Sequence, residues 1–215
     1  MVEKSLLEQA FKNSEIDCSR NISIRYYQPF NHSHGVLYTK GLSNKNQHEL
    51  ANRTENIHSF IELYFLLPSH WNLANENQKW PIEVLKRIID AQTEKNSWFG
   101  PGDTIPAHAK SANSEKLPTE INSAEERHTS INSIFKHTHF MFTEPIEGQA
   151  FLQSVQNEDE FYNWLGVIPI FEEEFAYKNS RSALELIMNF EKKKITELVD
   201  EFRPLGAKKK FFGLF

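Results

Sequence analysis

Two short apolar runs in the chain supply the first prediction about the fold. Residues 60–67 (FIELYFLL) are apolar at both parities except for Glu62, and the run stops at Pro68. This pattern is typical of a central strand that is covered on both faces. Residues 164–171 (WLGVIPIF) form the second run and predict a second strongly apolar strand.

Three further segments predict strands of a more ordinary kind. Residues 22–27 alternate between apolar and polar positions, which indicates an edge strand. Residues 35–42 predict a strand that is closed by Gly41, and residues 134–142 (IFKHTHFMF) predict another.

Two helices are predicted in the first half of the chain. Ser5 precedes Glu8 with capping-box spacing and predicts a short helix that runs to about Lys12. A longer helix is expected to begin at Trp80-Pro81, because proline suits the first helical position. Its predicted inward residues are Ile82, Val84, Leu85, Ile88 and Ile89, and its predicted outward residues are Glu83, Lys86, Arg87 and Asp90.

The C-terminal part of the chain predicts further helix. Acidic residues 172–174 suit a first helical turn, and we expect them to be solvated. Ser182 and Glu185 repeat the capping-box spacing, and Pro204 bars the continuation of the helix that follows. The apolar residues assigned to one face of that helix are Leu184, Ile187, Met188, Ile195, Leu198 and Val199.

This order of elements predicts a mixed α/β (α+β) fold, in which a mixed β-sheet is flanked by helices. The length of 215 residues fits a single domain. We expect an N-terminal helix and lead-in at residues 1–20, the domain at 21–205 and a C-terminal tail at 206–215. Residues 107–133 contain no aromatic residue and are rich in polar ones, so they predict a long polar insertion within the domain.

Composition and charge narrow the classes of partner and compartment. The net charge of −5 argues against a nucleic-acid-binding protein, which needs a concentrated basic surface. Cys18 is the single cysteine, which excludes an intramolecular disulfide and fits a reducing compartment. No stretch approaches the roughly 20 apolar residues of a membrane span, and the first residues do not resemble a signal peptide. We therefore expect a cytoplasmic protein.

The strongest candidate for a site is the loop WFGPGDT. Two aromatic residues run into a glycine–proline turn, and such a loop has a fixed shape and exposes backbone groups. Trp98 and Phe99 fit an interface and a core equally well, since aromatic residues are enriched in both. The candidate residues of this loop are Trp98, Phe99, Gly100, Gly102, Asp103 and Thr104.

Patterns of catalytic or metal-binding chemistry are weak in this chain. His32 and His34, and likewise His137 and His139, could share a metal ion as pairs, but no third ligand stands at a characteristic spacing. The chain has no GxSxG nucleophile motif and no Walker or dinucleotide glycine motif. We therefore predict no catalytic residues, no metal and no cofactor.

The ordered set of motifs resembles the suppressor of fused (SUFU) domain family, bacterial type. The resemblance covers most of the chain from about Tyr26 onward, and it departs from the usual bacterial pattern at Asp103, where histidine is frequent. The motifs that carry it are Gly41-Leu42-Ser43, residues 62–71 (ELYFLLPSHW), Trp80-Pro81, residues 98–104 (WFGPGDT), residues 167–178 (VIPIFEEEFAYK) and residues 203–215 (RPLGAKKKFFGLF).

The resemblance implies a suppressor-of-fused-like fold and a non-catalytic, protein-binding function. Bacterial members resemble immunity proteins, or antitoxins, that are encoded beside polymorphic toxins and neutralise them by direct binding. An acidic domain is suited to pair with a basic toxin surface. Two alternatives remain open: a metal-binding protein or enzyme that uses the His137/His139 strand and the Asp103 loop, and a membrane-surface adaptor that uses the basic, aromatic residues 208–215.

Overall fold

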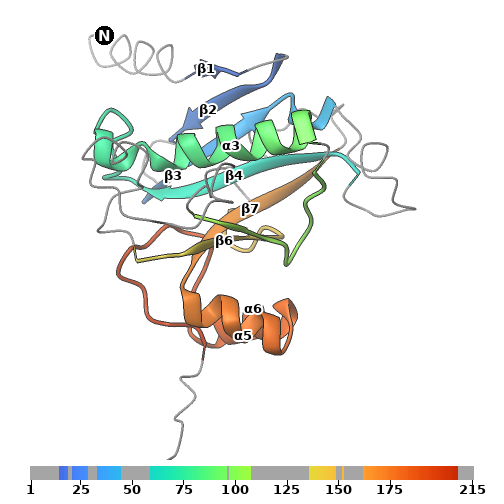
Figure 1. Ribbon diagram of the computed structural model, residues 1–215. Helices are drawn as coiled ribbons and strands as arrows, with labels where there is room; N and C mark the ends of the chain where they lie inside the picture. The colour runs from blue at the N-terminus through green and yellow to red at the C-terminus, as the bar shows by residue number, and fades with distance from the viewer. Residues whose placement is uncertain are drawn as a thin grey trace, which may run out of the picture.

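A computed structural model gives the fold of the chain (Figure 1). It describes residues 15–18, 21–28, 33–44, 59–95, 97–107, 136–148, 152 and 162–207. The predictions for the N-terminal helix, His32, most of the polar insertion and the tail from Lys208 lie outside the described residues.

Seven strands form one mixed sheet in the order β1-β2-β3-β4-β7-β6-β5. Adjacent strands pair antiparallel, except that β4 and β7 pair parallel. The strands are β1 (Glu15–Asp17), β2 (Ser23–Tyr27), β3 (His34–Lys40), β4 (Ile61–Pro68), β5 (Thr104–Pro106), β6 (His139–Thr143) and β7 (Asn163–Ile170). The mixed sheet and the central place of β4 confirm the predicted fold class.

Two predicted strands differ from the structure, one in its place in the sheet and the other in its first residue. The edge position predicted for residues 22–27 is wrong, because β1 pairs with β2 through Ile16 and Ile24 and takes that edge. The strand predicted from residue 134 begins only at His139, although Thr138 already donates its N–H to the oxygen of Ile170 at 3.0 Å.

Helices cover both faces of the sheet. In Figure 1, α3 (Trp80–Lys95) lies across the sheet, and α5 (Glu172–Ser180) and α6 (Ala183–Lys192) lie beyond β6. Phe140 and Phe142 of β6 pack in the cluster with α3, whereas Met141 between them packs with α6, so the helices cover opposite faces. Two 3-10 turns, η2 (Leu42–Asn44) and η3 (Glu76–Gln78), complete the described elements. In β4, Leu63 and Phe65 join the hydrophobic cluster under α3, whereas Tyr64 and Leu66 join a cluster on the opposite face. This division explains why the run is apolar at both parities.

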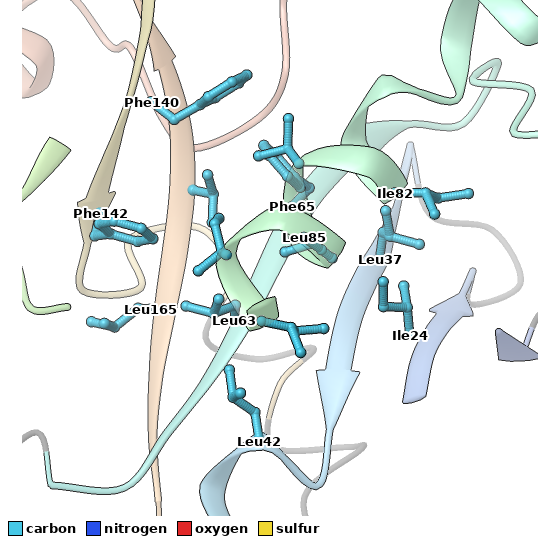
Figure 2. Close-up of a cluster of buried hydrophobic side chains, with 14 of the residues drawn as sticks. Ile24, Leu37, Leu42, Leu63, Phe65, Ile82, Leu85, Phe140, Phe142 and Leu165 are labelled. Atoms are coloured by element: carbon cyan, nitrogen blue, oxygen red, sulfur yellow. The ribbon is translucent and has the colours of Figure 1, made fainter. Parts of the chain in front are cut away.

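The cluster under α3 is the larger part of the core. Figure 2 shows side chains of β2, β3, β4, β6 and β7 converging on the helix. The ring of Phe65 stands edge-on to Trp80 at 5.4 Å and to Phe140 at 5.9 Å, a geometry that adds to the free energy of burial. All five residues predicted to face inward are buried.

One predicted outward residue of α3 has a structural role. The guanidinium of Arg87 donates hydrogen bonds to the backbone oxygens of Ala107 and Pro106, at 2.8 and 2.7 Å. Arg87 is therefore half-buried, and it holds the chain that leaves β5 against the helix.

The predicted course of the C-terminal helix is wrong beyond Lys192. Lys194 has a φ of 55°, and the N–H of Ile195 bonds to the oxygen of Phe190 at 2.9 Å, so the helix ends there. The buried stripe of α6 consists of Leu186 and Phe190. Leu184 and Met188, which we placed on the buried face, are 67% and 45% exposed. The error arose because the predicted apolar face extended to Val199 and so combined residues of the helix with residues of a segment that is not helical.

The N-terminal cap of α6 is confirmed. The hydroxyl of Ser182 accepts the N–H of Glu185 at 3.1 Å. Such a cap stabilises a helix by about 1 kcal/mol.

Three buried carboxylates tie loops to the sheet. Glu62 accepts the N–H groups of Gly41 and Ser43 at 2.9 and 3.0 Å, and burial raises the pKa of this carboxyl. Glu197 accepts three successive N–H groups, from residues 146, 147 and 148, at 3.0, 2.8 and 2.7 Å, together with the hydroxyl of Tyr64 at 2.9 Å. Because carboxylates accept several backbone hydrogen bonds at once, each of these residues fixes a whole turn.

The third buried carboxylate is that of Glu174. The prediction that residues 172–174 are all solvated is therefore wrong at this position. Glu174 is buried and forms two 2.6 Å hydrogen bonds with the guanidinium of Arg203. It also accepts the N–H groups of Phe171 and Gly206, at 2.9 and 2.6 Å. The pair anchors the chain after α6 to the start of α5, while the carboxylates of Glu172 and Glu173 are exposed.

Candidate functional site

The loop of residues 98–104 has a shape that its own side chains fix. The N–H of Gly100 donates to Oδ2 of Asp103 at 3.0 Å, and the N–H of Asp103 donates to the oxygen of Gly100 at the same distance. The ring of Trp98 lies over Gly100, where an added Cβ would come within 2.2 Å of the ring. Phe99 is buried and packs against Phe142 at 5.0 Å. Phe99 is thus a core residue, and Trp98 folds back over its own loop.

Backbone hydrogen bonds join this loop to the sheet. The N–H of Gly102 donates to the oxygen of Phe142 at 2.8 Å, and the N–H of Phe142 donates to the oxygen of Asp103 at 3.0 Å. The loop therefore extends the pairing of β5 with β6. A rigid sheet thus supports the loop, as precise recognition requires.

Gly102 is required where the loop meets α6. Its φ of 85° lies in the region that glycine tolerates and other residues avoid. An added Cβ would also come within 2.6 Å of the Cβ of Ala183, in the first turn of α6. This close approach places the loop directly against the helix.

Thr104 connects the loop to α5. Its hydroxyl accepts a hydrogen bond from Nζ of Lys178 at 3.4 Å. Burial lowers the pKa of Lys178, and the nearby negative charge of Asp103 opposes that effect. Asp103 and Thr104, the last two candidate residues of the loop, therefore lie near the half-buried ammonium group of Lys178.

The two histidines of the alternative hypothesis both face α5. His139 stacks on Phe175 with ring centroids 3.7 Å apart, and its Nδ1 lies 2.9 Å from the hydroxyl of Thr138 and 3.6 Å from a carboxylate oxygen of Glu172. His137 is buried and stacks on Phe171 at 4.2 Å.

Both imidazoles are harder to protonate than in solution. Burial, with a smaller effect from the charge of Arg203, lowers the pKa of His137 to about 3. Burial also lowers the pKa of His139, although Glu172 opposes the shift. Among the described residues, no group of three or more histidine, cysteine, aspartate or glutamate side chains could hold a metal ion.

The exposed part of the candidate site includes residues that sequence analysis did not select. Pro101 at the tip of the loop is exposed, and Gly102 and Thr104 are half-buried. Lys178 of α5 donates a hydrogen bond to Thr104, and Leu184 and Met188 are exposed on α6, the helix that Gly102 touches through Ala183. We refer to Pro101, Gly102, Thr104, Lys178, Leu184 and Met188 together as the loop–helix surface. Lys178 belongs to a motif of the resemblance, but a local pattern does not reveal that it meets a loop 74 residues earlier.

Comparisons with known proteins agree with this fold. The model of the family described as "Suppressor of fused protein (SUFU)" matches residues 19–204. The chain is similar to the crystal structure of a putative SUFU homolog from Neisseria gonorrhoeae FA 1090, with 15% identity, coverage of 96% of this chain and 95% of that chain, and a TM-score of 0.56. It is also similar to a chain of the Sufu–Fu complex, with 14% identity, coverage of 94% and 90%, and a TM-score of 0.53.

Two further findings complete the comparison. No curated protein matches the sequence. Within the described part of the chain, none of the helices combines the length and the apolar character that crossing a bilayer demands.

Proposed function

Because this chain belongs to the suppressor of fused family, we propose that it is a protein-binding domain whose partner docks on the loop of residues 98–104 and the adjoining helices. One similar structure is that of the Sufu–Fu complex, in which the matched protein is bound to another protein. The observation that carries the proposal is the loop itself. Its shape is fixed by hydrogen bonds to the sheet and by the Asp103 turn, yet its tip remains open to solvent.

A rigid, exposed loop is suited to binding because little conformational entropy is lost when a partner docks. Residues at binding surfaces lie disproportionately on loops that a rigid scaffold positions. Trp98, Phe99, Gly100 and Asp103 build the scaffold of this loop. Gly102 and Thr104 are half-buried beside the exposed Pro101, where the loop meets α6 and α5.

We further propose that the partner is a toxin and that this chain is its cytoplasmic immunity protein. The bacterial type of the resemblance supports this role, and one similar structure is a bacterial SUFU homolog. The net charge of −5 would speed association with a basic toxin surface, because opposite charges steer the encounter of two proteins.

The test is co-expression of the full chain with the product of the gene immediately upstream. We expect a stable 1:1 complex in size-exclusion chromatography and rescue of the host from the toxicity of that product. The absence of both a complex and rescue would refute the proposed function.

A matched pair of variants locates the contact. Pro101→Arg changes the exposed tip of the loop, whereas Ala74→Arg makes a similar change in an exposed turn near η3. We expect the first variant to weaken the complex and the second to leave it unchanged, with unaltered circular dichroism for both. If the two variants bind the partner with equal affinity, the loop is not part of the binding site.

A further inference from the structure

The loop–helix surface contains a cation, Lys178, that forms no ion pair among the described residues. The ammonium group of Lys178 makes one long hydrogen bond, 3.4 Å to the hydroxyl of Thr104, and no described carboxylate forms an ion pair with it. The nearest acidic influence is Asp103. One carboxylate oxygen of Asp103 accepts the N–H of Gly100, so this carboxylate closes the turn of the loop.

The position of Lys178 makes an arriving carboxylate favourable. The side chain is half-buried, and burial lowers its pKa because the charged form has lost part of its solvation. An anionic group that reaches Nζ would replace that solvation with a charge-assisted hydrogen bond, which is about twice as strong as a neutral one. The hydrogen bond to Thr104 is long and therefore weak, so it offsets little of the lost solvation.

Apolar side chains stand exposed on α6, the helix that the loop touches. Leu184 and Met188 are four residues apart on α6 and therefore share one face of the helix. Gly102 touches Ala183, the residue before Leu184, and Thr104 touches Lys178. Since Gly102 and Thr104 are two residues apart, the chain between these two contacts spans at most about 7 Å. Leu184 and Met188 themselves point away from the sheet, because Leu186 and Phe190 bury the opposite side of α6. A partner segment that crosses from α5 to this outer side of α6 would meet both the cation and the apolar ridge.

We propose that the loop–helix surface binds a protein segment that presents a carboxylate side chain to Lys178 and an adjacent apolar side chain to Leu184 and Met188. This inference rests on the proposed function and adds the chemistry of the bound segment. It is compatible with a partner that is basic overall, because net charge governs the encounter at long range while this contact involves one acidic residue.

The test uses the full chain and the upstream gene product in titration calorimetry. We expect Lys178→Glu to weaken binding by about tenfold or more, which corresponds to the loss of one charged contact. Lys192→Glu, which makes the same charge change at an exposed position at the end of α6, should alter affinity by less than about twofold. Leu184→Glu should weaken binding strongly, whereas Phe202→Glu, at an 88% exposed phenylalanine, should not.

A charge exchange makes the test specific for the carboxylate. In the presence of Lys178→Glu, each acidic residue of the partner is changed to lysine in turn. Restoration of affinity by one of these changes supports the proposal, because a general structural defect at Lys178 would not be repaired from the partner's side.

Every other result has a defined meaning. If the complex persists unchanged with both Lys178→Glu and Leu184→Glu, this inference is overturned while the proposed function stands. If the unmodified chain forms no complex at all, both are refuted. If the unmodified chain self-associates in light scattering and Lys178→Glu abolishes that association, the occupant is a second copy of the chain and the proposed segment is wrong.

Discussion

The two faces of the sheet are built in different ways. On the α3 face, a single amphipathic helix lies over the sheet and buries all its predicted inward residues in one large hydrophobic cluster. On the other face, α5 and α6 cover a smaller cluster, and the buried Glu174–Arg203 ion pair secures the chain that follows them. That face also leaves Leu184 and Met188 exposed.

Under the proposed function, this difference separates the face that supplies stability from the face that binds the partner. The α3 face uses its apolar residues within the core, where the free energy of burial is large. The α5–α6 face has apolar and charged side chains left over at its surface, next to a loop of fixed shape. Exposed apolar groups beside charged ones are characteristic of protein interfaces. The following predictions test this separation, from the largest expected effect to the smallest.

Phe65→Ala should destabilise the protein by about 4 kcal/mol, because it opens a cavity between Trp80 and Phe140 at the centre of the α3 face. Urea denaturation followed by tryptophan fluorescence measures the change. A loss below about 1 kcal/mol would show that this face is not the principal core.

Arg203→Ala should destabilise the protein by about 3 kcal/mol, because it leaves the carboxylate of Glu174 buried without its counter-ion. This expected loss of stability is at the lower end of the range for breaking a buried ion pair, because the N–H groups of Phe171 and Gly206 still bond to that carboxylate. The double variant Glu174→Gln/Arg203→Met should be less destabilised than Arg203→Ala. A double variant that is equally or more unstable would contradict this account of the pair.

The stability of the α5 side should depend on pH through His137. Its pKa of about 3 in the folded protein lies below the unfolded value of about 6.5, so the unfolded chain binds more protons between these limits. The free energy of unfolding should therefore fall by about 2 kcal/mol from pH 7 to pH 5 through this residue. His137→Phe keeps a ring against Phe171 and should remove that part of the slope.

His139 contributes in the same direction, since its pKa is also lowered, so the comparison of the two pH profiles isolates His137. Parallel profiles for the unmodified chain and His137→Phe would show that His137 is protonated equally in both states.

Leu184→Ala should change the free energy of unfolding by less than about 0.5 kcal/mol, because the side chain is 67% exposed. The same substitution should weaken partner binding measurably. A large loss of stability would place Leu184 in the core, as its position in the sequence pattern first predicted.

Local patterns predicted the elements whose packing depends on few neighbours. The run at residues 60–67, the α3 stripe and the Ser182 cap each follow from residues close in sequence, and each appears in the structure. The course of the chain beyond Lys192 could not be predicted in this way. There the N–H of Val199 bonds to the oxygen of Leu66, and a contact with a distant strand overrides helical periodicity.

The shape of the candidate loop was predicted for the same reason, whereas its role as a binding site stays a prediction. The glycine–proline turn at residues 100–102 indicated a fixed loop, and the structure has one, which the carboxylate of Asp103 closes. Lys178 is joined to that loop only by folding, and Leu184 was assigned to the wrong face of its helix. Glu174 and Arg203 are 29 residues apart, so nothing local distinguishes the buried glutamate from its two exposed neighbours.

The most direct test of the separation between the two faces is hydrogen–deuterium exchange of the full chain, alone and in complex with the upstream gene product. We predict that the partner slows exchange in residues 98–107 and 178–188 and leaves exchange in α3, residues 80–95, unchanged. Protection centred on α3, with unchanged exchange in the loop and in α6, would contradict the account, because it would place recognition on the face that we assign to stability.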